Sequence, residues 1–186
     1  MTLGQYFIAV VMGFFVSLAV VPIDKTTDIE KAINYSKQYT PKAKYTVLVD
    51  FSKPADQHRL FLINVDTKEI EYSWYTSHGK NSGGLNQAVR FSNIPGSKQS
   101  SLGVYKTAET YFGKHGLSLR LDGLSLTNSN VRARSVVLHN AQYVSQSWMK
   151  YHNFPGRSDG CITLDPAVSK DIIEKLGKGS VIYVVG

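Results

Sequence analysis

The chain of 186 residues contains a single cysteine, Cys161. One cysteine excludes an internal disulfide, so packing and hydrogen bonds have to stabilise the fold. The length suffices for one domain with a hydrophobic core of its own. The lone thiol is either a small buried side chain or a chemically active one.

A dense block of basic residues is also missing, although 21 Lys and Arg against 14 Asp and Glu give a net charge of +7. The basic residues are scattered along the chain, which argues against a nucleic-acid-binding surface. Excess positive charge still favours an anionic partner, such as an acidic lipid or a carboxylate-rich polymer. We expect no nucleic-acid partner.

The histidines and the cysteine show none of the standard metal-ligand spacings, such as CxxC or HxxxH. We therefore expect no metal site and no cofactor. The residues considered for such a site are His78, His115, His139, His152 and Cys161.

The N-terminus has no Lys or Arg before its apolar run, which extends over residues 6–21. Sixteen residues are short for a membrane span, which needs about 20, but suit the hydrophobic region of an export signal. We expect residues 1–21 to be a signal peptide or a membrane anchor, with the rest exported to the periplasm or cell envelope. A buried core helix, which would leave the chain in the cytosol, is the third interpretation.

The rest of the chain divides into a helical and a β-rich part. Residues 26–39 predict a helix that ends before Pro41, so residues 22–44 are expected to form a spacer or a packing helix. From residue 45 onward, short β-branched and aromatic runs between turn signals predict strands. One helix is indicated late, from Asp165-Pro166 to Gly177, before a final strand. We expect a mainly β domain over residues 45–186, a closed barrel or a sandwich.

Cys161 and His139 are the candidates for covalent chemistry. A cysteine attacks as its thiolate and needs a base or a positive field. His139 follows the apolar run "SVVL" and would be held on a rigid strand, while the turn Ser158-Asp159-Gly160 can aim backbone N–H groups at an oxyanion. The alternative is that the histidine is structural and the turn has no catalytic role. The residues alone leave the catalytic and the structural interpretation open.

The stretches "VVLHNA" and "SDGCITL" resemble the signature of the L,D-transpeptidase catalytic domain, which acts on peptidoglycan. Residues 90–124 and the run Ser77-His78-Gly79 resemble a branch described as murein L,D-transpeptidase catalytic domain-like. The resemblance covers roughly residues 45–186. It implies an L,D-transpeptidase-like β-sandwich or barrel.

The resemblance also implies roles for individual residues. Cys161 would be the nucleophile, His139 the general base, and the amides of Gly160 and Cys161 part of the oxyanion hole. Backbone carbonyls near Asn140 would orient the imidazole. Family members often have a histidine in place of Asp159 and an arginine in place of Thr163. The residues expected to bind substrate are Arg157, which would replace that arginine, Ser158, Asp159, Asn140, His78 and Tyr111, with Tyr143 and His115 as further wall residues. A turn role is the equal alternative for His78, and a loop role is the alternative for His115.

The implied activity is that of a monomeric cysteine acyltransferase acting on peptidoglycan stem peptides through a thioester. Water as acceptor would instead give an L,D-carboxypeptidase or endopeptidase. A non-catalytic wall-binding module is the alternative from another class of protein.

Overall fold

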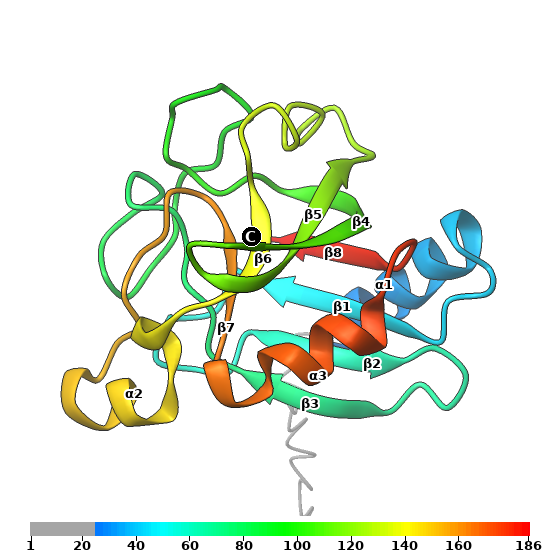
Figure 1. Ribbon diagram of the computed structural model, residues 1–186, viewed down its shortest axis with the longest axis horizontal. Coiled ribbons are helices and arrows are strands. Elements are labelled where there is room, and N and C mark those ends of the chain that lie inside the picture. Colours follow the sequence, from blue (N-terminus) through cyan, green and yellow to red (C-terminus); the bar gives the residue numbers. More distant parts are fainter. Residues whose placement is uncertain (1–24) are drawn as a thin grey trace, which may run out of the picture.

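The computed structural model describes residues 25–186 (Figure 1). The predicted signal peptide or anchor at residues 1–21 lies outside this part. Within residues 25–186 no helix is both long enough and apolar enough to cross a membrane.

The strands form one curled, nearly closed sheet in the order β3-β2-β1-β8-β4-β5-β6-β7 (Figure 1). Neighbouring strands run antiparallel except for the pairs β1–β8 and β6–β7, which are parallel. The strands are β1 (Tyr45–Asp50), β2 (Leu60–Asn64), β3 (Ile70–Trp74), β4 (Gly103–Gly113), β5 (Gly116–Gly123), β6 (Val137–Asn140), β7 (Ile162–Leu164) and β8 (Val181–Val185). The helices are α1 (Lys25–Tyr39), the 3₁₀ turn η1 (Gln142–Val144), α2 (Gln146–His152) and α3 (Pro166–Leu176). The expectation of a mainly β fold with a late helix and a final strand is confirmed.

Helix α3 covers one face of the sheet and closes the main core. Asp165 caps it by accepting the Ala167 N–H at 2.9 Å, with Pro166 in the first turn. Its buried side chains, Ile172 and Ile173 among them, join the apolar residues of the strands in one cluster. This is the helix that the sequence indicated, because cap, proline and apolar spacing all point to the same start.

Helix α1 packs on the outer face of the same sheet. Ala32 and Ile33 are buried there against Leu48 of β1 and Ile63 of β2. The helix predicted over residues 26–39 is therefore present, and it lies against the strands.

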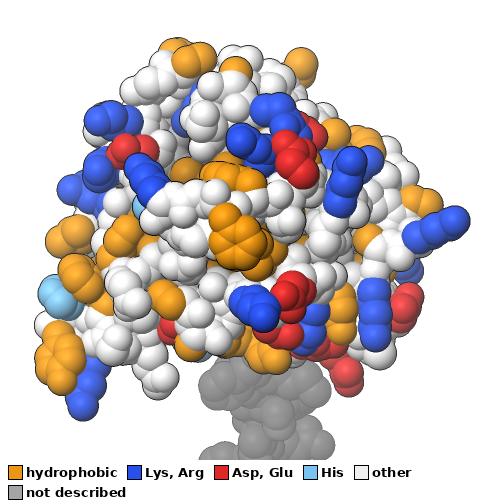
Figure 2. Space-filling model, in the orientation of Figure 1, with side chains coloured by type: hydrophobic (Ala, Val, Ile, Leu, Met, Phe, Trp, Pro, Cys, Tyr) orange, Lys and Arg blue, Asp and Glu red, His pale blue; other side chains and the backbone are white. Residues whose placement is uncertain are grey.

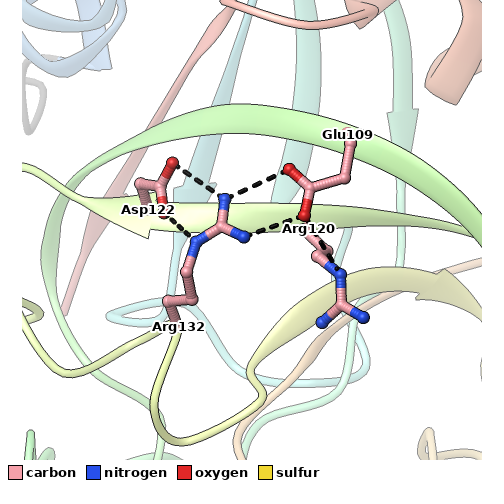
Figure 3. A network of polar contacts seen from close by, with 4 residues as sticks. All are labelled: Glu109, Arg120, Asp122 and Arg132. Atoms are coloured by element: carbon pink, nitrogen blue, oxygen red, sulfur yellow. Dashed lines mark hydrogen bonds and ion pairs between the residues drawn. The ribbon is translucent and has the colours of Figure 1, made fainter.

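An ion-pair network ties the segment after β5 to the β4–β5 hairpin (Figure 3). Arg132 contacts Asp122 of β5, and its Nη1 donates to Glu109 Oε1 of β4 at 2.8 Å. Arg120 approaches the same Glu109 carboxylate at 3.2 Å. The four side chains are exposed, so each pair adds little free energy, but together they fix the base of the hairpin.

The surface carries its positive charge in a dispersed form. Figure 2 shows Lys and Arg side chains spread in small groups over the face in view, with acidic side chains beside several of them. The scattered charge seen in the sequence thus stays scattered on this face of the fold.

Candidate active site

A cavity of about 570 Å³ brings Cys161 and His139 together. It lies where the β4–β5 hairpin, the end of β6 and the segment before β7 meet. The other side chains on its wall are Lys80, Tyr111, Lys114, His115, Arg134, Ser135, Val137, Tyr143, Arg157, Ser158 and Asp159.

His139 is held on both sides by the sheet. Its backbone is paired with Ser118 of β5 and with Thr163 of β7. Its Nδ1 lies 2.6 Å from the carbonyl oxygen of Asn140 and donates to it. The ring therefore leaves Nε2 as the acceptor nitrogen, which is what a general base requires.

His115 and Asn140 support this imidazole from the hairpin. The ring of His115 stacks on that of His139 with centroids 4.1 Å apart. The side-chain amide of Asn140 donates to the His115 carbonyl at 2.5 Å, which holds the hairpin tip in place. The Asn140 side chain was expected to bind substrate; it lies outside the cavity wall because this contact engages it.

The thiol of Cys161 lies 3.9 Å from the carbonyl oxygen of Ser135. Among the described residues the structure gives no hydrogen bond between Cys161 and His139. Nucleophile–base contacts are often loose until substrate binds, so a shared cavity remains the relevant geometry.

Both groups are neutral at pH 7. Burial lowers the pKa of His139 to about 4, against the hydrogen bond to Asn140, and His115 and Lys114 lower it further. Burial also raises the pKa of the Cys161 thiol, and the Asp159 carboxylate adds to this, while the backbone of Val137 opposes it. The resting pair is therefore a thiol and an imidazole, and attack has to be coupled to proton transfer.

The turn before Cys161 is closed by Ser158. Its hydroxyl donates to the Cys161 carbonyl at 2.9 Å and accepts the Gly160 N–H at 3.1 Å. The Gly160 amide was expected to face an oxyanion, but in the structure it is used inside the turn. The Cys161 N–H donates to no acceptor in the described part of the protein.

Arg157 and Asp159 lie on the wall beside this turn. Arg157 Nη1 donates to the carbonyls of Lys80 at 3.1 Å and Gly83 at 2.9 Å, so its charge is met by neutral oxygens. Asp159 pairs with Lys80 at 3.1 Å in an exposed salt bridge. The cavity wall carries four basic side chains, from Lys80, Lys114, Arg134 and Arg157, and one carboxylate, so the cavity favours an anionic ligand.

Thr163 is buried in a network of hydroxyls. Its Oγ1 accepts the Ser77 N–H at 2.9 Å and donates to Ser77 Oγ, while its own N–H donates to Thr76 Oγ1 at 3.1 Å. These bonds tie β7 to the segment after β3.

His78 was expected on the cavity wall or in a turn, and it lies in the loop after β3 and not among the residues of the wall. Its Nδ1 accepts from the buried Arg59 guanidinium at 2.9 Å and its Nε2 donates to the Gly84 carbonyl at 2.8 Å. Burial lowers the pKa of His78 to about 4, and the charge of Arg59 lowers it further. His78 thus serves as a neutral link inside the loop after β3.

This environment makes stability depend on pH. The pKa of His78 is depressed in the folded state relative to about 6.5 in an unfolded chain, so the unfolded state binds more protons and stability falls as pH falls toward 4. The unaltered protein should lose unfolding free energy between pH 7 and pH 5. We expect His78→Gln, which keeps one acceptor and one donor, to reduce that loss by about 2 kcal/mol. Denaturant unfolding at both values measures this. The exposed His152→Gln should change nothing, and an unaltered pH dependence in His78→Gln would contradict the assignment.

Arg134 is a wall residue for which the sequence held no signal. Its guanidinium donates to the carbonyls of Ser92 at 2.7 Å and Gln99 at 2.5 Å, and to two serine hydroxyls. These bonds hold the long loop before β4 to the cavity wall that also carries Cys161. Because these partners are neutral, its charge remains available to the cavity. Tyr143 and His115, expected as further wall residues, are on the wall, as is Tyr111.

The protein belongs to the L,D-transpeptidase catalytic domain family, whose model matches residues 22–185. Solved structures with a similar fold include an L,D-transpeptidase from Mycobacterium tuberculosis H37Rv (12% identity, TM-score 0.50, covering 77% of this chain and 58% of that one). Another is an L,D-transpeptidase from Mycobacterium smegmatis (14% identity, TM-score 0.47, covering 77% of this chain and 59% of that one). A third is from Stackebrandtia nassauensis (18% identity, TM-score 0.44, covering 87% of this chain and 66% of that one). The chain thus spans about three fifths of the length of these structures. Comparison with curated proteins gave no match.

Proposed function

We propose that the protein is a peptidoglycan L,D-transpeptidase that uses Cys161 as nucleophile and His139 as general base. The observation that carries this is the shared cavity, in which the imidazole is fixed with Nε2 as acceptor by the Asn140 carbonyl. Membership of the family supports a function of this kind.

The first half-reaction releases a D-residue. Cys161 Sγ attacks the carbonyl carbon of an L-centre joined to a D-residue while Nε2 of His139 takes the thiol proton. The resulting oxyanion is met by the Cys161 N–H. The C–N bond then breaks, the leaving amine takes the proton from His139, and a thioester remains on Cys161.

The second half-reaction restores the thiol. The amine of another stem peptide attacks the thioester, His139 accepts its proton, and the C–S bond breaks to leave a new amide and a thiolate that takes the proton back. Water in place of the amine gives a carboxylic acid, which is the hydrolytic alternative. The basic wall formed by Lys80, Lys114, Arg134 and Arg157 favours the carboxylates of stem peptides.

Export is part of the same proposal. The apolar run at residues 6–21 supports a signal peptide or an anchor, and peptidoglycan stem peptides lie outside the cytoplasm. Fractionation tests this directly: finding the chain soluble in the cytoplasm with residues 1–19 intact would contradict export.

The activity is tested by incubating the full chain with disaccharide-tetrapeptide and analysing the products by mass. We expect either cross-linked dimers with the D-residue released, or tripeptide if water is the acceptor. Cys161→Ala should form neither. Binding of peptidoglycan with no turnover in the unaltered protein would instead favour the wall-binding module.

A further inference from the structure

A second cavity, of about 880 Å³, lies beside the active site and shares no residue with it. It is bounded by the end of β3, which is the edge strand of the sheet, by the segment before β2, and by α2. In Figure 1, α2 lies at one side of the molecule, next to the end of β3. The mechanism proposed above makes no use of this space.

Aromatic rings form one wall of the second cavity. Trp74 closes β3 and is half-buried against the core, with its ring 4.8 Å from that of Tyr72. The ring of Tyr75 meets that of His58 edge to face at 4.7 Å, and His58 Nδ1 lies 2.8 Å from Ser73 Oγ. These contacts fix the rings before any ligand arrives.

Three other side chains of the lining are polar and bond to no other group of residues 25–186. The amides of Gln146 and Asn153 and the carboxylate of Asp56 line the cavity, and none of them makes a side-chain hydrogen bond or ion pair within residues 25–186. Planar amides and carboxylates offer paired donors and acceptors that suit neighbouring hydroxyl groups.

The charge of this cavity differs from that of the active site. The lining carries one carboxylate, Asp56, and one ammonium group, Lys150, while Asp165 caps α3 and accepts the Gln146 N–H. Fixed aromatic rings beside the side-chain amides of Gln146 and Asn153 match a pyranose, whose C–H face packs on a ring while its hydroxyl and amide groups take the polar partners.

The two cavities lie within reach of one substrate. Tyr143 lines the active site and Gln146 the second cavity, and three residues span at most about 11 Å. Likewise, Cys161 lines the active site and Asp165 the second cavity, and four residues span at most about 14 Å. In peptidoglycan the stem peptide is covalently attached to an N-acetylated amino sugar.

We propose that the second cavity binds the glycan of the peptidoglycan substrate while the stem peptide occupies the active site. The identity of the sugar rests on the proposed function; the carbohydrate chemistry of the cavity rests on Trp74, Tyr75, Gln146 and Asn153.

Binding is tested with the full chain and a β-1,4-linked tetramer of N-acetylglucosamine, which carries no peptide, followed by calorimetry and tryptophan fluorescence. We expect saturable binding that Gln146→Ala and Asn153→Gly each weaken about three- to tenfold. Glycine suits the left-handed backbone of Asn153 (φ 61°), so this variant keeps the fold. The matched control Gln142→Ala, an exposed glutamine outside both cavities, should bind as tightly as the unaltered protein. No binding, or binding that neither variant weakens, would overturn the proposal.

A kinetic arm separates this proposal from the proposed function. Acylation of Cys161 should have a higher kcat/KM with disaccharide-tetrapeptide than with the free tetrapeptide, and Gln146→Ala should bring the ratio toward one. Acylation by both substrates at equal rates, with no tetramer binding, would overturn the glycan site and leave the transpeptidase proposal standing. Tetramer binding without any acylation would support the glycan site and overturn the transpeptidase proposal.

Discussion

Replacing His139 with glutamine is expected to slow acylation of Cys161 at pH 7 by about 10²- to 10⁴-fold, the usual contribution of a general base. The reason lies in the protonation states: burial raises the pKa of the Cys161 thiol, so the resting nucleophile still carries its proton at pH 7. Glutamine keeps the size of the side chain but has no basic nitrogen to take that proton. Rapid-quench mass spectrometry with a stem-peptide substrate measures the rate.

The pH profile gives an independent readout of the same residue. Because the pKa of His139 is about 4, the base is unprotonated from about pH 5 upward, and we expect kcat/KM to fall only as pH drops below that. His139→Gln should lose this acid limb, and His152→Gln should keep it. A limb near pH 6.5 in the unaltered protein would contradict the buried environment of His139.

The second large effect is expected at Gly160. Its φ of +114° is strained for any other residue, and a Cβ would lie 2.7 Å from the backbone oxygen of Gln99. Gly160→Ala should therefore cost about 3 kcal/mol of unfolding free energy through strain and overlap. The displaced turn should also move the Cys161 thiol, and a shift near 1 Å reduces acylation about 10²-fold. Denaturant unfolding and acylation kinetics measure the two losses.

Gly179 provides the matched control for this substitution. It has a similar φ of +99°, but nothing lies within 4 Å of the position of its Cβ. Gly179→Ala should cost only the strain, about 1 kcal/mol, with acylation unchanged. Equal losses in the two variants would show that the contact with Gln99 is irrelevant.

Local sequence patterns predicted the helices and strands that are determined by residues close together in the chain. The α3 helix combines a cap, a proline and one apolar face within twelve residues, and the strands carry β-branched runs between turns. His139 lies near the end of β6 and Cys161 lies directly before β7, and each belongs to a stretch that resembles the family signature. Their shared cavity follows from the pairing of β6 with β7.

Contacts between distant segments could not be predicted from local patterns. His78 was expected on the cavity wall or in a turn, and nothing local indicates that Arg59, directly before β2, donates to its ring. Asn140 and Gly160 were assigned by motif position, and their donors are taken by His115 and Ser158. Arg134 was missed because its partners lie in a loop more than thirty residues away, which no spacing rule brings near.

The formation of an acyl-enzyme on Cys161 is tested by measuring the intact mass of the protein, quenched during reaction with a disaccharide-tetrapeptide. We expect an adduct whose mass is that of the substrate less the released D-amino acid, located by peptide mapping on Cys161 within residues 156–164. The adduct should be absent in Cys161→Ala. Full turnover in Cys161→Ala, or an adduct on another residue, would contradict the role of Cys161 as the nucleophile.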